Sequence, residues 1–242
     1  MPAKVFSAEL EGIDAQAIEV EVDLGVGLHA FNVVGLADKA VNEAKERVNS
    51  ALKNSGVKPP NRENRRITVN LAPAHVKKNG SQYDLAIAIG YMLASGQIKE
   101  FETKDKILIG ELALDGRLRP IHGSLNIAEL ASRLGKKFIL LPKENANEAS
   151  VIKDVQIIPL ESLGEAIEFL EDKKEILPFE FSRNEKVVAS VPDFSEIKGQ
   201  HQAKRAALIA AAGGHNLLFT GPPGSGKSLL AQALSGILPE LA

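Results

Sequence analysis

A glycine-rich segment near the end of the chain constrains the fold more than any other feature. It reads Gly221-Pro-Pro-Gly-Ser-Gly-Lys-Ser228 and fits the Walker A pattern, in which two spaced glycines precede a lysine and a serine. A buried strand is predicted before it, at residues 216–220, and a helix after it, ending near Ile237. Strand, loop and helix in this order are typical of an α/β phosphate-binding (P-loop) domain. The last part of the chain is therefore predicted to open such a domain.

The residue types in this loop suit a nucleotide phosphate. Glycines let backbone N–H groups turn toward phosphate oxygens, and the N-terminus of the following helix adds partial positive charge. Lys227 is expected to neutralise the β- and γ-phosphates, and Ser228 to offer its hydroxyl to Mg²⁺. The predicted cofactors are thus ATP and Mg²⁺, and the predicted nucleotide-binding residues are Gly221, Pro222, Pro223, Gly224, Ser225, Gly226, Lys227 and Ser228. The alternative is a Gly/Pro-rich turn that matches the pattern by chance.

The residues that hydrolysis requires are not found after the loop. Phosphoryl transfer needs an acidic residue that holds Mg²⁺ and a group that positions water, and in P-loop folds both come from later strands. Only 14 residues follow Ser228, and none of them forms a strand ending in Asp-Glu. We therefore expect the ATPase domain to be truncated here, with no catalytic residue and no hydrolysis by this chain alone.

Composition excludes several other classes of protein. Hydrophobic residues make up 44% of the 242 residues and charged residues 25%, which is typical of globular chains. The absence of cysteine excludes disulfides, thiolate zinc sites and cysteine nucleophiles. No apolar run approaches the ~20 residues that span a bilayer, so we expect a cytoplasmic protein with no membrane partner. The five histidines lack metal-binding spacing, so no metal beyond nucleotide-bound Mg²⁺ is expected.

Periodicity predicts two domains of different kinds. Strict apolar/acidic alternation from Ala17 to Leu24 indicates a half-buried strand, and apolar residues on one face from Asp38 to Asn54 indicate a helix that ends before Gly56. Further strands are predicted at 31–34, 66–71, 138–141 and 155–158, a hairpin around Asp115-Gly116, and helices at 85–93, 124–134, 161–171 and 199–212, with Ser81 and Ser124 as helix caps. The predicted division is an α+β domain at 1–175, a linker at 176–191 and the start of the P-loop domain at 192–242.

Basic residues gather between Lys53 and Lys78. This stretch holds seven lysines and arginines against one acid, Glu63, in a chain of formal net charge −2. An exposed positive loop binds nucleic-acid backbones by releasing counterions. The candidate DNA contacts are Lys58, Arg62, Arg65 and Arg66. In the alternative interpretation the loop is solvated and its arginines pair with acidic strand residues, which are Glu19, Glu21 and Asp23.

Several motifs together resemble one protein family. Pro192-Asp-Phe-Ser-Glu-Ile-Lys-Gly-Gln200 and Ala210-Ala-Ala-Gly-Gly-His-Asn-Leu217 lead into the phosphate loop, while Gly35-Leu-Ala-Asp38 and Arg65-Arg-Ile-Thr-Val-Asn-Leu-Ala-Pro73 lie far upstream. Over essentially the whole chain they resemble the magnesium-chelatase-like AAA+ ATPases of the YifB/ComM group. The resemblance implies that Ile197 and Gln200 belong to the segment lining the adenine pocket. It also implies a homo-oligomeric ring, usually a hexamer, in the full-length parent.

The first domain is similar to the proteolytic domain of Lon-type proteases. The resemblance is carried by the segments from Lys77 to Asp84 and from Gly110 to Ile121. In Lon the first segment carries the serine nucleophile, and a lysine base follows the second. Here Gln82 stands at the serine position and Leu125 at the lysine position, with Asn126 beside it. Because a Ser–Lys dyad needs both groups within hydrogen-bond reach, we expect a Lon-like fold without peptidase activity.

These observations predict a fragment of an ATP-driven motor. The expected fold is a Lon-proteolytic-domain-like α+β domain followed by a truncated α/β P-loop AAA+ domain. The family resemblance favours action on DNA, as a helicase or in branch migration during recombination or natural transformation. Two alternatives stay open: a non-catalytic module that binds DNA or protein, and a magnesium-chelatase-like motor for metal insertion.

Overall fold

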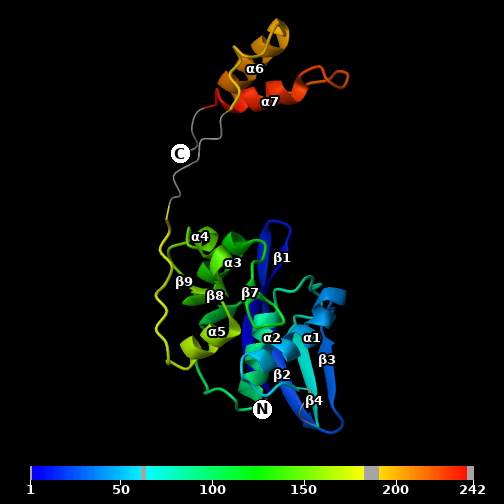
Figure 1. Cartoon of the computed structure of the whole chain (residues 1–242), viewed down its shortest axis with the longest axis vertical. Coiled ribbons are helices and arrows are strands. Elements are labelled where there is room, and N and C mark those ends of the chain that lie inside the picture. The colour runs from blue at the N-terminus through cyan, green and yellow to red at the C-terminus, as the bar shows by residue number, and fades with distance from the viewer. Residues whose placement is uncertain (1, 61–63, 183–190, 239–242) are drawn as a thin grey trace. The chain divides into compact units, whose positions relative to one another are not determined.

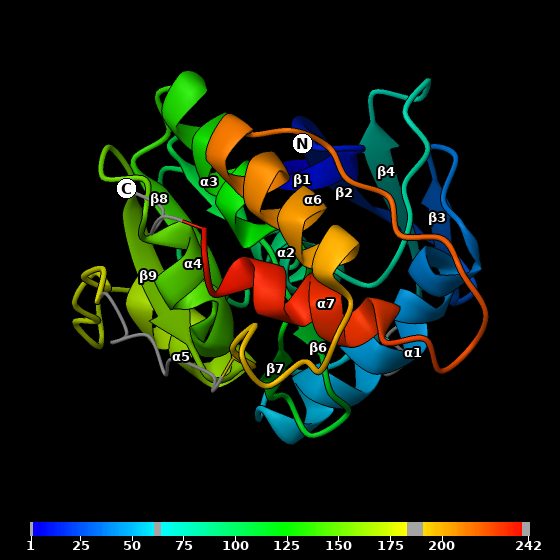
Figure 2. The same cartoon turned by 90° about the horizontal axis from the view of Figure 1, so that it is seen from above.

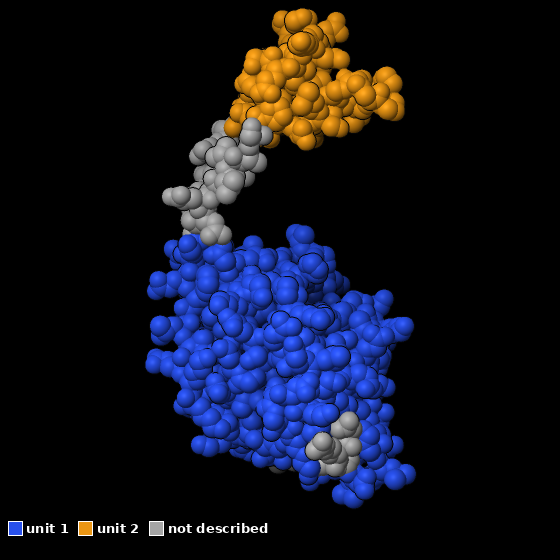
Figure 3. All heavy atoms as spheres, viewed as in Figure 1, with its two compact units in different colours: residues 1–182 blue, residues 183–242 orange. Residues whose placement is uncertain are grey.

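The computed structural model describes residues 2–60, 64–182 and 191–238. The chain divides into two compact units, residues 1–182 and residues 183–242, which are coloured separately in Figure 3. Of the predicted linker at 176–191, residues 183–190 lie outside the described residues. Each unit is presented by itself.

A four-stranded sheet forms one half of the first unit, in the order β1-β2-β4-β3. Its strands are β1 (Ala3–Glu11), β2 (Asp14–Val26), β4 (Arg65–Ala72) and β3 (Ala30–Val34). β1, β2 and β4 pair antiparallel, whereas β3 pairs parallel with β4, with Ala30 opposite Arg66 and Val34 opposite Asn70. Figures 1 and 2 both show β3 at one outer edge of this sheet. The alternation predicted in β2 is confirmed, since Ile18, Val20 and Val22 are buried.

Two helices cover the inner face of this sheet. α1 (Lys39–Asn54) begins after Asp38, whose side chain accepts a hydrogen bond from the Val41 N–H at 2.8 Å. α2 (Asp84–Ala94) is buried over nearly its whole length and contacts both β1 and β2. Such an all-round apolar helix belongs inside a core rather than at a surface. The two helices and the sheet therefore share one large hydrophobic core.

A second, smaller sheet forms the other half of the first unit. β5 (Lys106–Leu108), β8 (Phe138–Pro142) and β9 (Gln156–Leu160) pair parallel in that order, and β6 (Glu111–Leu112) pairs with β7 (Leu118–Arg119) in the predicted hairpin. The helical segments here are α3 (Ser124–Arg133), η2 (Lys143–Asn145), α4 (Ala146–Ala149) and α5 (Leu163–Leu170). The predicted mixture of helices and strands is thus confirmed, and it includes a parallel sheet.

A glycine turns the chain sharply between β3 and α1. Gly35 has a φ of 110°, and a Cβ atom there would lie 2.2 Å from the Leu71 carbonyl oxygen. Any side chain would therefore force the chain off β4. This close approach holds Asp38 where its second carboxylate oxygen accepts from the Gly80 N–H at 3.2 Å. The Gly35-Leu-Ala-Asp38 motif thus positions the start of α1 against the loop that precedes α2.

Both serines predicted to cap helices have other roles. Tyr83 is the N-cap residue of α2, and the Ser81 hydroxyl instead donates to Glu111 Oε2. Gly123 is the N-cap of α3, and the Ser124 hydroxyl donates to the Glu148 carboxylate at 2.5 Å. The two cap predictions are wrong because Tyr83 and Gly123 occupy the N-cap positions, and neither helix has a side-chain cap hydrogen bond.

The second unit contains two described helices, α6 (His201–Gly213) and α7 (Lys227–Ser235). The predicted strand at residues 216–220 is not formed: the segment is irregular, because no strand in the described part of this unit offers it a hydrogen-bonding neighbour. No helix among the described residues is both long and apolar enough to cross a bilayer.

Candidate functional site

The phosphate-loop residues curve around the amine of Lys227. Its Nζ donates to the Gly221 carbonyl at 2.9 Å, the Pro222 carbonyl at 2.7 Å and the Ser225 hydroxyl at 3.3 Å. Gly224 and Gly226 have φ values of 78° and 83°, a left-handed conformation that favours glycine. The loop therefore folds back on the amine of its own lysine, which two loop carbonyls and one hydroxyl hold in place.

Helix α7 begins directly at Lys227, so the loop ends at a helix N-terminus. The first N–H groups of a helix have no partner within it and carry partial positive charge. Ser228 lies in this first turn with its side chain exposed. Backbone N–H groups, an ammonium and a hydroxyl are thus presented from one short stretch, a donor set suited to phosphate oxygens and to a phosphate-bound Mg²⁺.

The predicted adenine-pocket residues lie in the same unit and have different environments. Gln200 Nε2 donates to the Ser225 carbonyl at 3.3 Å, which joins the start of α6 to the loop. Ile197 is only 5% exposed and packs with Leu230 and Ala233 of α7. Gln200 thus reaches the phosphate loop directly, whereas Ile197 supports the helix that follows it.

Gln82, at the position of the Lon serine, lines a separate hollow of about 380 Å³ in the first unit together with Ser81, whereas Leu125 is not part of its lining. Gln82 Nε2 donates to Glu9 Oε2 at 3.1 Å, and the Ser81 hydroxyl donates to Glu111. Leu125 lies half-buried at the start of α3. No amine bonds to either Ser81 or Gln82 in the described structure, so the geometry offers no Ser–Lys dyad.

A buried carboxylate organises the residues around this hollow. Glu9 is 4% exposed and accepts hydrogen bonds from the Tyr83 hydroxyl, from Gln82 and from the Asn79 N–H. Burial, followed by the hydrogen bond to Glu9, raises the pKa of Tyr83 well above its usual range, so the phenol stays protonated. Lys78 lies nearby in sequence, but its amine donates to the Pro73 carbonyl, and burial lowers its pKa. The sequence analysis did not predict the hydrogen bond between Glu9 and Tyr83. The alternation of residues in β1 does not show that Glu9 is buried and accepts hydrogen bonds inside the unit.

The predicted basic loop is only partly confirmed as exposed. Lys58 is exposed, whereas Pro59 and Pro60 are buried, and the Lys58 carbonyl accepts from Gln97 Nε2 at 3.1 Å. Arg65 and Arg66 are exposed at the start of β4, and Arg62 lies outside the described residues.

The acidic strand residues do not hold Arg66 in an ion pair. Glu19 and Glu21 pair with Lys4 at 2.7 and 2.8 Å, and Asn70 donates to Glu21 at 2.8 Å. Arg66 forms no ion pair with any carboxylate that the structure describes. The interpretation in which the strand acids neutralise the arginines therefore fails for Arg66.

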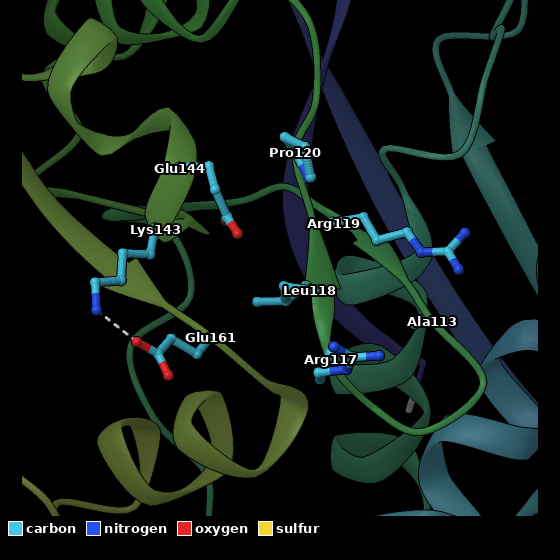
Figure 4. A pocket seen from close by; sticks show the side chains of 8 residues that line it. All are labelled: Ala113, Arg117, Leu118, Arg119, Pro120, Lys143, Glu144 and Glu161. Carbon is cyan, nitrogen blue, oxygen red and sulfur yellow. Dashed lines mark hydrogen bonds and ion pairs between the residues drawn. The ribbon is translucent and has the colours of Figure 1, made fainter.

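Another hollow, of about 560 Å³, lies beside the β6–β7 hairpin (Figure 4). It is lined by charged side chains, but its cations already have carboxylate partners. Lys143 pairs with Glu161 at 2.5 Å, Arg119 with Glu111 at 3.1 Å, and Arg117 with Asp115 at 2.8 Å. Because each positive charge is neutralised locally, this hollow gives no reason to assign an anion site.

Sequence comparison identifies both units with one family. Residues 20–145 match the family model described as "Subunit ChlI of Mg-chelatase", and residues 193–242 match the one described as "Magnesium chelatase, subunit ChlI". The first match covers more than half of the chain, and the second contains the phosphate loop.

Individual relatives agree with this assignment. The chain is 43% identical to the competence protein ComM of Haemophilus influenzae over 99% of its own length and 47% of that protein, and 40% identical to YifB of Escherichia coli over 96% and 45%. It is 30% identical to the Lon protease of Rhizobium meliloti over 56% of its length and 17% of that protein. The chain spans about half the length of the ComM and YifB relatives. The match to the Lon protease supports the predicted Lon-like similarity for about half of the chain. Taken with the two family matches, these identities show that the chain belongs to the magnesium-chelatase ChlI-like family, as a protein of the YifB/ComM type.

Proposed function

We propose that this chain supplies the nucleotide-binding loop and a non-catalytic first domain to an ATP-dependent AAA+ motor that acts on DNA. The observation that carries the proposal is the wrapped loop at Gly221–Ser228, with the Lys227 amine held by two loop carbonyls at the N-terminus of α7. Phosphate oxygens offer that amine stronger, charged acceptors than carbonyls do. The residues fit ATP and Mg²⁺, which would supply the phosphoryl-transfer chemistry, and the working assembly would be a hexameric ring.

Nucleotide binding tests the first half of this proposal. Replacing Lys227 with Ala removes the charge that meets the phosphates, and hydrogen bonds to charged groups are worth about 1.5–3 kcal/mol. We expect the affinity for a fluorescent ATP analogue with Mg²⁺, measured by titration of the chain, to fall by roughly ten- to hundredfold. The matched control is Arg205→Ala, which removes an exposed cation from α6 and should leave the affinity unchanged.

A second variant separates metal binding from phosphate binding. Ser228→Ala should weaken binding in Mg²⁺ and have little effect in EDTA, because only the metal-bound nucleotide uses the hydroxyl. Equal affinities for the wild type and Lys227→Ala would contradict the proposal and leave the loop as a Gly/Pro-rich turn.

DNA is the substrate that we propose for the motor. The support is the 43% identity to a protein named for competence and the basic stretch before β4. We expect Lys58, Arg62 and Arg65 to contact phosphates without reading sequence. In the triple variant with Gln at these positions, the slope of log affinity against log salt should flatten by roughly 0.7–0.9 for each lost contact.

The DNA measurement is made by anisotropy of a labelled duplex at several salt concentrations. Lys53→Gln is the control, because it removes an exposed lysine from the end of α1 outside the proposed contacts. If the triple variant folds normally and the slope is unchanged, these cations do not contact DNA phosphates.

A further inference from the structure

We propose that the open edge of β3 is a docking groove for an extended, acidic peptide segment of a partner protein, which adds there as a further strand. The groove shares no residue with the phosphate loop or with the proposed DNA contacts Lys58, Arg62 and Arg65. Arg66, which follows Arg65 in the sequence, belongs to the groove. The groove encloses about 530 Å³ and is lined by residues of β3, α1 and β4. The free edge of β3, the charge of the groove and its apolar surface each favour an extended acidic peptide.

The strand itself supplies the main-chain part of the site. β3 is the last strand in the order β1-β2-β4-β3, so β4 occupies one of its edges and no described strand pairs with the other. A free edge presents a row of N–H and C=O groups at the spacing of another strand. Only an extended polypeptide matches that row, and peptides that add to a sheet edge in this way are a recurrent mode of recognition.

Two unpaired cations flank the open edge on opposite faces of the sheet. Lys45 lies on α1, which covers the inner face, while Arg66 lies on β4 among outward-facing residues that alternate with the buried Ile67 and Val69. Both side chains are exposed, and neither forms an ion pair with a carboxylate in the described ranges. The groove therefore carries positive charge above and below the strand that would enter it.

The arrangement of these cations predicts the spacing of acids in the ligand. Successive side chains of a strand point to opposite faces. One acidic residue meeting Lys45 and another meeting Arg66 must therefore stand an odd number of positions apart. Two acids an even number apart would both face the same side and could reach only one of the cations.

Apolar surface lies beside the same edge. Val34 and Leu36 are 46% and 61% exposed at the end of β3, and Leu36 has a φ of 55°, which is uncommon for leucine. The groove contains one aromatic ring, Phe31, which is partly buried against the core. Single-stranded nucleic acid stacks its bases on exposed aromatic rings, which this lining does not offer, and a free strand edge beside apolar side chains favours a peptide.

The test uses short synthetic peptides, labelled for anisotropy and rich in Val and Thr, with two glutamates. In one peptide the glutamates are an odd number of residues apart, and in a second peptide of equal composition they are an even number apart. We expect the chain to bind the first more tightly. N-methylation of alternate backbone nitrogens should abolish binding, because it removes the donors that pair with a strand edge.

Variants of the chain locate the binding. Lys45→Gln and Arg66→Gln should each weaken binding by about two- to fivefold, the usual worth of an exposed ion pair. The control Lys53→Gln removes an exposed lysine from the same helix outside the groove and should change nothing. The single variants alter exposed side chains, and circular dichroism confirms that they remain folded.

Three results would overturn the proposal. Equal binding of the N-methylated peptide would show that the strand edge is not used. Displacement of the peptide by a duplex oligonucleotide, with the same loss in Lys45→Gln and Arg66→Gln, would make the groove a nucleic-acid surface. Concentration-dependent dimerisation that both variants abolish would make a second copy of the chain the occupant. None of these outcomes depends on ATP, so failure here is distinguishable from failure of the proposed motor function.

Discussion

Asp84 is an ionisable residue buried in the core of the first unit. Its side chain is fully buried at the start of α2, where Arg47 of α1 donates to both carboxylate oxygens at 2.6 and 3.0 Å. The Leu112 N–H of β6 donates to it at 3.2 Å. One carboxylate therefore ties together two helices and the hairpin, and these bonds offset part of its desolvation cost.

The pH dependence of stability should show this burial. Desolvation raises the pKa of Asp84 from 3.8 to about 6, although Arg47 lowers it. Between these values the folded state keeps a proton that the unfolded state has lost. The contribution of Asp84 is thus complete below pH 3.8 and falls as pH rises through 6, by ~3 kcal/mol. Urea unfolding at pH 4 to 7 should show this fall in the wild type relative to Asp84→Asn.

Other acids titrate in the same range, so the comparison with Asp84→Asn is the informative quantity. The difference in unfolding free energy between the two proteins should decrease from pH 4 to 6 and level off above it. A constant difference over that range would mean that the Arg47 guanidinium keeps Asp84 ionised throughout. Lys53→Gln serves again as the control, because it changes an exposed charge in the last turn of α1.

At the scale of elements, the sequence predicted those whose pattern is set by a single buried face. The alternation in β2 and the helical face of α1 arise because each packs one side on the common core, so apolar spacing alone identifies them. The end of α1 near Gly56 could also be predicted, because a glycine commonly follows a helix C-terminus in a left-handed conformation. Gly56 has a φ of 75°. The residues of these elements alone therefore contain enough information to predict them.

Elements that depend on a distant partner could not be predicted in the same way. The segment 216–220 has the apolar composition of a strand, yet a strand exists only where another strand accepts its hydrogen bonds. Ser81 matches a capping pattern, but α2 begins after Tyr83, and the Ser81 hydroxyl donates to Glu111, thirty positions away. Local propensity is a weak prior wherever a long-range bond competes with it.

The candidate site follows the same rule. The phosphate loop could be proposed from the sequence because all its expected donors lie within one continuous segment, from Gly221 to Ser228. Family resemblance suggested an adenine-pocket role for Gln200, and its hydrogen bond to the Ser225 carbonyl was not predicted. The groove beside β3 was not predicted, because the strand order and the positions of Lys45 and Arg66 on either side of β3 are properties of the folded unit.

On the scale of the whole molecule, stability resides in two cores of the first unit. The larger core joins the four-stranded sheet with α1 and α2, and the smaller one packs α3 and α4 on β8 and β9. Every residue of both cores lies within residues 1–182. In the described part of the second unit, the core cluster consists of Ile197, Leu230 and Ala233, and the small residues Ala207 and Ala210 of α6 are also buried. Because buried apolar area dominates folding free energy, the first unit should fold without the second.

A fragment of residues 1–182 should therefore unfold in urea with the same main transition as the whole chain. Leu52 is fully buried in the larger core, so Leu52→Ala should lower the unfolding free energy by about 2–5 kcal/mol in both proteins. Leu230→Ala, in the whole chain, truncates an equally apolar side chain of the second unit and should leave that transition in place. A main transition that shifts in the fragment, or that moves with Leu230→Ala, would show that the first unit depends on residues beyond 182.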